Sequence, residues 1–483
     1  MDPYHAPMAG ISLGSLAPPD VDVGAAADLP QSRLLDSKPF FGERINDTTA
    51  TYSTTDPDDE QRPMVIQTTL FVARPPSVSY VLAWATGTLF TEEPLVLSTH
   101  GGFVLLSMAV RFKKWPFSEY YIYHTGRDHG GDGRPELYQI QQPNSMRLVN
   151  ECYAVGLVSH GGGYHVAALA IQENGEFLFY IFSSETRAWT IKKPVLSLAD
   201  GATDLGDYMP DKAIAVGDGG VMAFVDLWNG ILFCNVLDSG EHVELCYLRL
   251  PSAELCRPDM NYYRLQPRDI AFDMSNDTIR IRFVEVVCPS FSPGWRASTW
   301  TTTTTATSPW RQQEKGWQQG FVLYDHELLV ADGVSTDGLL PEVSELAETQ
   351  LANLLVDMPM LSLHENNIIC FLAKHHIADS EVWSIAVDME MKKLKGVNLL
   401  QVGRCTTLFY STISSHLNMT AAASGNQREK ECPWPGTQLE SYPHKKQQQR
   451  DTFAYIKLSM MSSAVGEQEQ DAMGASDGDE DNV

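Results

Sequence analysis

Short apolar runs separated by turn residues fill most of this chain, and this pattern predicts a protein built from β-strands. The clearest example is VMAFVDLWNGILFCNVLDSG, residues 221–240, in which two apolar runs flank Asn229-Gly230. Asn-Gly favours a two-residue turn with positive φ at both positions, which joins neighbouring antiparallel strands. With KAIAV before it and HVELCYLRL after it, the segment predicts a four-stranded meander of about 40 residues.

The same succession of strands and turns recurs on both sides of this segment. Residues 152–197 contain CYAVGLV, GYHVAALAI, EFLFYIF and AWTIKKPVL, and residues 359–400 contain PMLSLHE, NIICFLAK, EVWSIAVDM and KLKGVNLL. Such four-stranded units, repeated every 40 to 60 residues or so, are typical of β-propeller blades. Runs such as VMAFV are apolar on both faces, which suits strands that lie between neighbouring sheets. We therefore predict an all-β, propeller-like body of about six or seven four-stranded blades, with a β-sandwich as the alternative.

Composition sets the expected boundaries of this body. Residues 1–32 are rich in Pro, Ala, Gly and Asp without periodicity, and residues 461–483 form an acidic tail, so both ends are expected to be disordered. The propeller-like domain then spans residues 33–460. Loop insertions are expected at 294–316, which contains a threonine run, and at 411–452, which is polar and Gln-rich.

Two segments depart from the strand pattern. PEVSELAETQLANLL, residues 341–355, has helical periodicity and predicts one short amphipathic helix. Packing of this helix on the β body is preferred over binding to a partner. The basic residues Lys445, Lys446 and Arg450 are expected to be solvated, although a nuclear-import role is a further hypothesis.

Charge and the cysteine pattern exclude several classes of function. The chain has 35 Lys+Arg against 61 Asp+Glu, and its net charge of −26 opposes binding to phosphate backbones and anionic lipids. The start MDPYHAPMAG lacks the basic segment of a signal peptide, and no apolar run approaches the roughly 18 residues of a membrane span. We expect no nucleic-acid or membrane partner, and a cytoplasmic or nuclear rather than secreted protein. The eight cysteines are then expected to be free thiols, and because they form no C-x-x-C pair, zinc is not indicated.

Carboxylates are the main candidates for chemistry, because some propeller enzymes use converging acids near the central channel. Asp226, Asp269, Asp273 and Asp388 are predicted at or near strand ends. Among 61 acids, such placements are expected by chance. We therefore assign no catalytic, cofactor-binding or metal-binding residue, and expect no cofactor.

The glycine-rich and histidine-containing motifs also have simple interpretations. RDHGGDGR (127–134) and ADGVSTDG (331–338) do not fit a calcium loop and predict turns. HGGGYH (160–165) predicts a hairpin loop, because a strand rather than a helix follows it. The adjacent His375 and His376 would point to opposite faces of a strand.

The sequence assigns neither a catalytic triad nor an aromatic binding site. A Ser-His-Asp triad is defined by geometry and cannot be recognised from sequence. Trp295, Trp300 and Trp310 are expected to pack between blades rather than to bind a sugar or peptide.

Several stretches along the chain are together similar to the plant family known as domain of unknown function 1618, which is expanded in grasses. They are LLDSKPFFGERINDTTA, ARPPSVSYV, SEYYIYHTG, ELYQIQQP, FYIFSSETRAWTIK, GGVMAFVDLWNGILFCNVLD, RDIAFDM and GWRASTW. The hairpin around Trp228-Asn229-Gly230 is the most specific of them. The resemblance implies a propeller-like body related to the kelch-type regions that follow F-box motifs, and it implies no activity and no catalytic residue. The chain departs from the family after residue 411 and in its acidic tail.

These observations favour a non-enzymatic propeller that binds another intracellular protein through its loops, since hairpins place variable loops on a rigid scaffold. The alternative is an enzyme or lectin that acts on a sugar or small metabolite at the channel mouth. A third hypothesis, the substrate arm of a ubiquitin ligase, needs an F-box from a separate chain, because the first 60 residues contain no amphipathic helices to form one. The sequence leaves the oligomeric state open.

Overall fold

The computed structural model divides the chain into two units, residues 1–430 and 431–483. Every described residue belongs to the first unit. The described residues are 18–19, 31–56, 59–88, 90–110, 117–126, 133–143, 152–171, 176–197, 208–251, 267–275, 277–288, 294–305, 315–336, 354–376, 379, 381–400 and 407–417.

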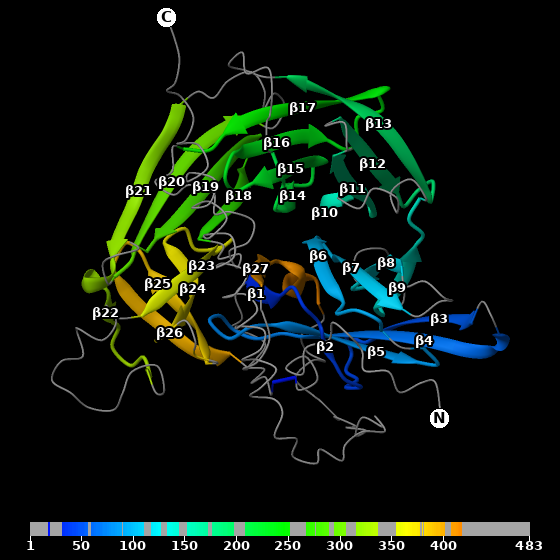
Figure 1. Ribbon diagram of the computed structural model, residues 1–483, viewed down its shortest axis with the longest axis horizontal. Helices are drawn as coiled ribbons and strands as arrows, with labels where there is room; N and C mark the ends of the chain where they lie inside the picture. The colour runs from blue at the N-terminus through cyan, green and yellow to red at the C-terminus, as the bar shows by residue number, and fades with distance from the viewer. Residues whose placement is uncertain are drawn as a thin grey trace, which may run out of the picture. The chain divides into compact units, whose positions relative to one another are not determined.

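Six inner strands lie side by side around the centre of the first unit (Figure 1). In ring order they are β6 (Leu95–His100), β10 (Cys152–His160), β14 (Lys212–Val216), β18 (Arg268–Ser275), β23 (Leu355–Leu361) and β27 (Leu408–Ser411). The ring closes between its first and last strands, where Thr99 Oγ1 lies 2.8 Å from Ser411 Oγ. The described residues thus form a β-propeller of six blades, which confirms the predicted fold class.

Five blades are built from consecutive strands, each paired antiparallel with the next. Blade II adds β7 (Phe103–Val110), β8 (Phe117–His124) and β9 (Glu136–Ile140) to β6; blade III adds β11 (Gly163–Ile171), β12 (Phe177–Ser183) and β13 (Ala188–Ser197) to β10. Blade IV adds β15 (Val221–Asp226), β16 (Gly230–Asn235) and β17 (His242–Arg249) to β14; blade V adds β19 (Thr278–Val287), β20 (Arg296–Thr305) and β21 (Lys315–Tyr324) to β18. Blade VI adds β24 (Ile368–Lys374), β25 (Val382–Asp388) and β26 (Lys393–Leu400) to β23. The strands of blades III and IV match the predicted segments closely, as do β24, β25 and β26, whereas the first strand of blade VI, predicted within residues 359–365, runs from Leu355 to Leu361.

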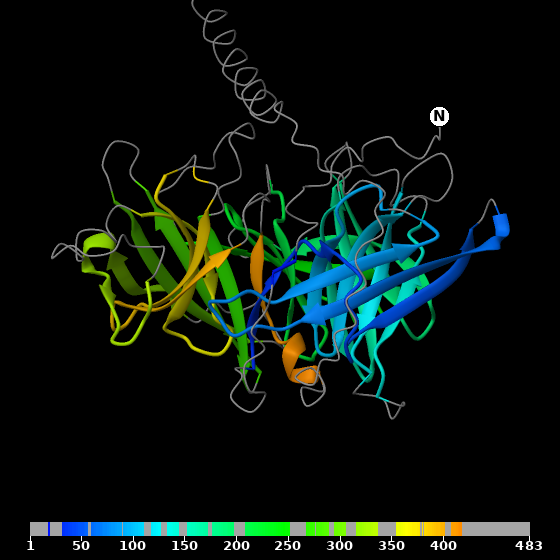
Figure 2. The ribbon, with the colours of Figure 1, turned by 90° about the horizontal axis from the view of Figure 1, so that it is seen from below.

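Blade I combines the N-terminal strands with the last inner strand. β1 (Arg33–Asp36) pairs antiparallel with β27, with Arg33 opposite Ser411. β1 and β2 (Phe40–Phe41) lie parallel to the chain that runs into β5 (Tyr80–Thr86), and β4 (Asp59–Phe71) and β3 (Ala50–Asp56) follow outward. After β27 comes the short 3-10 helix η5 (Ile413–His416), drawn in orange in Figure 2. The ring is therefore closed by strands about 370 residues apart in sequence.

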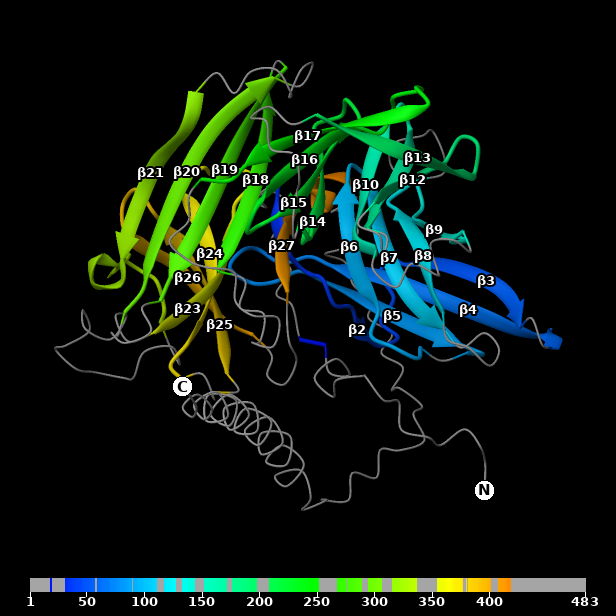
Figure 3. The ribbon, with the colours of Figure 1, turned by 45° about the horizontal axis from the view of Figure 1, so that its top comes forward.

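Outer strands also connect neighbouring blades at two places. The second half of β13 pairs parallel with β17, with Lys193 opposite His242 (Figure 3). After the 3-10 helix η3 (Asp325–Glu327), β22 (Leu329–Val330) pairs parallel with β26. In both places, the chain leaving one blade adds a strand to the rim of the next.

The hydrophobic core has one cluster at each of the six junctions between consecutive blades, and a small seventh cluster lies within blade I. Blade IV shows how one strand serves two clusters. Met222 and Phe224 of β15 pack against blade III, whereas Val221 and Val225 pack against blade V. This alternation explains why VMAFV is apolar on both faces, as the sequence interpretation proposed.

The Asn-Gly hairpin has a different turn from the one predicted. Asp226 lies opposite Gly230, so the loop consists of the three residues Leu227, Trp228 and Asn229, and neither Asn229 nor Gly230 has positive φ. The carboxylate of Asp226 accepts the backbone N–H groups of Trp228 and Asn229, at 2.8 and 3.1 Å. These local bonds to an aspartate override the preference of Asn-Gly for a two-residue turn.

The expected insertion at 294–316 is wrong for its first half, because residues 296–305 form β20. Threonine is β-branched and favours strands, and within the run Thr302 and Thr304 are buried while their neighbours are partly exposed. The expected loop at 411–452 is wrong at its start. There Ser411 ends β27, and Ile413 and Leu417 are buried against blades I and II.

The predicted helix at 341–355 lies mostly outside the described residues. Its end is corrected, because Leu355 begins β23 and burial alternates over Leu354, Leu355 and Val356, as in a strand. Within the described part of the chain, no helix is long and apolar enough to cross a membrane.

Candidate functional site

The four aspartates considered from sequence each have a structural role. Asp226 is fully buried, and besides the two turn amides its carboxylate accepts Met209 N at 2.7 Å and Asn229 Nδ2 at 2.8 Å. Asp388, at the end of β25, accepts the backbone N–H groups of Glu390 and Met391 in the next turn. Both carboxylates therefore hold turns.

The other two aspartates connect blades. Asp269 receives Lys212 Nζ from blade IV at 2.5 Å and Leu361 N from blade VI at 2.8 Å, so that it links three blades. Asp273 accepts Arg282 Nε at 2.8 Å, and the same arginine donates to the carbonyl of Ser362 in blade VI. The structure does not bring the four aspartates together into one site.

Where the structure describes them, the remaining motifs largely have the predicted conformations. HGGGYH forms the hairpin between β10 and β11, and ADGVSTDG turns at Asp332-Gly333. Trp295 is buried between blades V and VI, with its ring 6.0 Å from that of Phe371, as predicted. Most of RDHGGDGR and all of Trp310 lie outside the described residues.

The structure also places Trp300 and the adjacent residues His375 and His376. The ring of Trp300 lies 5.7 Å from that of Phe283 of the same blade, at the edge of the cluster between blades IV and V. His375 and His376 follow the end of β24 instead of lying on a strand; the His375 ring packs on Trp383 and the His376 amide donates to Asp379.

A different set of polar residues meets where the inner strands of blades II, III and IV end. Ser159 Oγ of β10 lies 2.8 Å from His100 Nδ1 of β6, and Asp218, in the turn after β14, lies with Oδ1 3.9 Å from His100 Nε2. We call these three residues the His100 site. They come from three consecutive blades and from positions 100, 159 and 218, and only the assembled ring places them together.

The hydrogen bonds define the tautomer of His100. The backbone N–H of Ser159 donates to His100 Nδ1 at 3.1 Å, so Nδ1 is the unprotonated nitrogen and the proton is on Nε2. The Ser159 hydroxyl, 2.8 Å from the same Nδ1, then donates its proton toward it. Nε2 is left facing Asp218, beside the backbone of Gly217.

Burial is the main influence on the charge of this histidine. The His100 side chain is 16 % exposed, and its pKa is lowered from its ordinary value chiefly by burial. Asp218 and a hydrogen bond with the Gly217 backbone act in the opposite direction, and His416 adds to the lowering. His100 is therefore neutral at neutral pH and can accept a proton.

The glycine that follows His100 leaves room at the serine. Gly101 has φ of +56°, and a Cβ placed on it would lie 2.6 Å from Ser159 Oγ. Gly161, after His160, has open space around its missing side chain. A side chain at position 101 would therefore press on the Ser159 hydroxyl, and glycine avoids this contact.

Sequence reasoning assigned no role to these residues, although a signal exists. Thr99-His-Gly-Gly and Ser159-His-Gly-Gly repeat the same pattern at the ends of the inner strands β6 and β10. The repeat marks equivalent turns of two blades, but which side chains meet across the blades depends on three-dimensional geometry.

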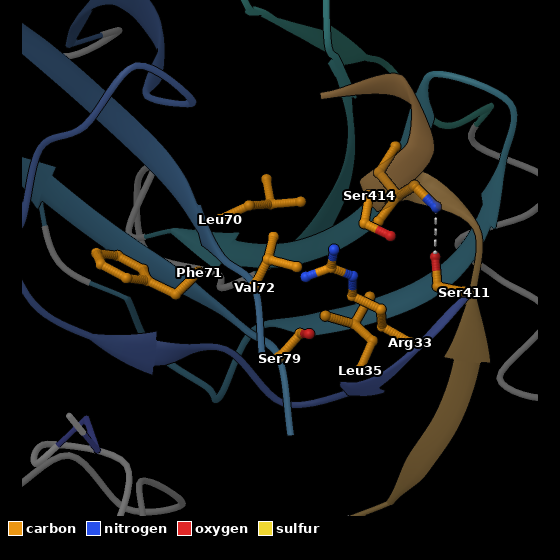
Figure 4. A pocket seen from close by; sticks show the side chains of 9 residues that line it. Arg33, Leu35, Leu70, Phe71, Val72, Ser79, Ser411 and Ser414 are labelled. Atoms are coloured by element: carbon orange, nitrogen blue, oxygen red, sulfur yellow. Dashed lines mark hydrogen bonds between the residues drawn. The ribbon is translucent and has the colours of Figure 1, made fainter. Parts of the chain in front are cut away.

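A second feature is a cavity of about 10 Å³ where blade I closes, shown in Figure 4. Arg33 of β1 points into it, together with Ser79, Ser411 and Ser414. The pKa of Arg33 is lowered to about 10, first by burial and then by the charge of Arg74. This volume holds only about one water molecule. We therefore interpret the cavity as a packing gap where blade I closes the ring.

Comparison with known proteins gives one family and distant structural neighbours. Residues 224–370 match the model of a family described as "Protein of unknown function (DUF1618)", which confirms the resemblance over this segment. No curated protein matches the chain.

Three solved structures illustrate the neighbours. The WD40 domain of SCAP from fission yeast is 8% identical, with 74% of this chain and 73% of that chain covered and a TM-score of 0.33. AofleA from Arthrobotrys oligospora is 11% identical (78% and 92% covered, TM-score 0.33), and the Cps50 (Swd1) β-propeller domain of Myceliophteria thermophila is 8% identical (76% and 89% covered, TM-score 0.33). Because these scores are low, the fold rests on the strand pairing described above.

Proposed function

We propose that this six-bladed propeller is a scaffold that binds another intracellular protein through turns gathered on one of its faces. The observation that carries the proposal is the arrangement of these turns. The inner strands run in the same sense around the ring, as the successive pairs Ser98–Leu157 and His100–Ser159 show for β6 and β10. The turns after β6, β10 and β14 consequently share one face, which we call the first-turn face.

Other connections reach the same face. β8 is two antiparallel steps from β6 and runs parallel to it, so the end of β8 and the start of β9 also lie on this face. A rigid body that presents many independent turns on one side suits recognition of a protein surface. The blade-to-blade bonds of Asp269 and Arg282 support this rigidity.

The test compares two faces of the same protein. Replacement of residues 126–135 or 159–163 by Gly-Ser linkers of equal length alters the first-turn face. Replacement of 375–381, between β24 and β25, alters the opposite face and serves as the matched control. We expect affinity capture from cell extract, followed by cross-linking, to recover a partner whose yield falls at least tenfold with the first two variants only.

Equal recovery with all three variants would contradict the proposal. So would cross-links confined to the opposite face. Each variant is first compared with the parent by thermal unfolding, so that loss of the partner is read only from folded protein.

A further inference from the structure

We infer that Ser159 is a nucleophile that His100 activates as general base, and that the His100 site transfers acyl groups from small esters. This activity goes beyond partner binding and does not depend on it. The inference rests on the 2.8 Å contact between Ser159 Oγ and His100 Nδ1 and on the direction of the proton in that contact.

The partner of the hydroxyl separates Ser159 from two neighbouring serines. Ser98 Oγ, at the same junction between blades, accepts the backbone N–H of Leu157 at 3.2 Å. Ser184 Oγ, in a turn of blade III, accepts the N–H of Tyr164 at 2.8 Å. The Ser159 hydroxyl instead faces the unprotonated Nδ1 of His100, an acceptor that it shares with the Ser159 backbone N–H, and transfer of the hydroxyl proton to this nitrogen makes the oxygen more nucleophilic.

The reaction balances with the groups present and water. Ser159 Oγ forms a bond to the ester carbonyl carbon while its proton passes to His100 Nδ1. The tetrahedral intermediate collapses, the bond from carbon to the alcohol oxygen breaks, and His100 returns the proton to that oxygen. Water then attacks the acyl-serine in the same way, with His100 again taking and returning the proton, and a carboxylic acid leaves.

Asp218 acts as a positioning residue. Its Oδ1 lies 3.9 Å from Nε2, beyond hydrogen-bond distance, and its side chain is 96 % exposed, so it acts through charge and favours the imidazolium formed during the reaction, while the Gly217 backbone hydrogen-bonds with the ring. His160, the last residue of β10, contacts the Asp218 carbonyl through Nδ1 at 2.9 Å. Three blades therefore contribute to the orientation of one imidazole.

Space and protonation state agree with this role. Gly101 leaves the hydroxyl uncovered, since a Cβ there would lie 2.6 Å from Ser159 Oγ. The charged groups facing His100 are Asp218 from blade IV and His416 from η5, and burial keeps the imidazole neutral at neutral pH. The reactivity of Ser159 should therefore be full at neutral pH and fall as acid protonates His100.

The test uses the full chain and a fluorophosphonate probe, which forms a bond from Ser159 Oγ to phosphorus with loss of fluoride. We expect one adduct that peptide mass spectrometry places at Ser159, and none in Ser159→Ala. His100→Gln keeps a polar side chain but removes the base, and should slow labelling on the order of 100-fold. Ser184→Ala is the matched control and should label as the parent does.

The pH profile tests the orienting role of Asp218. Because Asp218 raises the pKa of His100, Asp218→Asn should move the midpoint of the labelling rate to lower pH, a change that a purely structural role would not produce. Hydrolysis of p-nitrophenyl acetate should follow the same order of variants.

Two results would overturn the inference. One is absence of an adduct at Ser159 in protein that unfolds like the parent, and the other is equal labelling of the parent and His100→Gln. A second variant, Ser159→Cys, gives an independent readout. Activated by His100, its thiol should react with iodoacetamide below pH 7, and reaction only near the ordinary cysteine pKa of about 8.5 would refute the base role. None of these measurements involves the protein partner, so they fail or succeed separately from the proposed function.

Discussion

Blades IV and I form their sheets in different ways. Blade IV is a continuous segment, Lys212–Arg249, whose strands follow one another through short turns. Blade I joins β27, near residue 410, to strands that begin at Arg33. Blade IV therefore depends on local turn chemistry, whereas blade I depends on the pairing of distant strands that closes the whole ring.

The difference predicts where the propeller is most vulnerable. A defect in blade IV should weaken one blade and its two junctions, whereas loss of β27 opens the ring. The four variants below follow this order, from the largest expected effect to the smallest.

The largest effect is expected when the chain ends at residue 406, which removes β27 and η5. This truncation removes Leu408, Ile413 and Leu417 from the core. At about 1.5–3 kcal/mol for each buried side chain, the loss is roughly 5–9 kcal/mol, comparable with the roughly 5–15 kcal/mol that stabilises a typical domain. We expect no cooperative thermal transition. A transition like that of the full chain would show that the other five blades do not need closure.

The second effect concerns the junction between blades IV and V. Arg268 donates to Glu285 at 2.6 and 2.9 Å and to the carbonyl of Leu227 at 3.1 Å, and its guanidinium lies 4.0 Å from the centre of the Trp228 ring. Arg268→Ala leaves Glu285, which is 1 % exposed, without this partner, and should cost about 3–5 kcal/mol in chemical denaturation.

The control for Arg268 is a double variant. Arg268→Met with Glu285→Leu replaces both charges by apolar groups and should recover most of the lost stability. Equal destabilisation by the single and double variants would indicate that the arginine acts through packing rather than charge.

The third effect tests the corrected turn of blade IV. A Cβ on Gly230 would lie 2.4 Å from the Tyr247 ring and 2.6 Å from the Leu248 carbonyl oxygen. Gly230→Val should therefore destabilise by about 1–3 kcal/mol through overpacking, not through positive φ. Gly219→Val, where no atom lies within 4 Å, is the control and should change the thermal midpoint much less. Equal shifts in the two variants would refute the close contact.

The smallest effect is expected when the chain ends at residue 465. Residues 466–483 carry seven acids and no base, and have no apolar face to bury. The thermal midpoint and the circular dichroism of the truncated chain should match those of the full chain. A weaker β signal would mean that this segment stabilises the body.

The same comparison explains what the sequence could predict. The strands of blade IV could be predicted because each strand pairs with the next one along the chain. The pairing of Arg33 with Ser411 cannot be predicted from any local sequence pattern. The residues around Ile413 are polar and predict a loop, although this segment packs in the core. The threonine run predicts a loop by its polarity, but its β-branched side chains favour the strand β20.

The His100 site follows the same physical rule. Ser159, His100 and Asp218 lie on three inner strands or turns, about 60 residues apart along the chain. Each occupies an ordinary position at the end of an inner strand or in the turn after it. Their proximity depends on the number and packing of the blades, which no local pattern encodes.

The central structural claim, that β1 and β27 close the ring, can be tested by a cross-link in register. Leu35 lies opposite Phe409, so cysteines at these two positions should form a disulfide on mild oxidation, since opposite residues of antiparallel strands have Cα atoms about 4.5–5.5 Å apart, within the range that a disulfide spans. A pair shifted by two residues, at 35 and 411, is the control. We predict that peptide mapping finds the 35–409 disulfide in most molecules, with a higher thermal midpoint, and little of the 35–411 disulfide. Equal yields of the two pairs, or cross-links mainly between molecules, would contradict closure by the two strands.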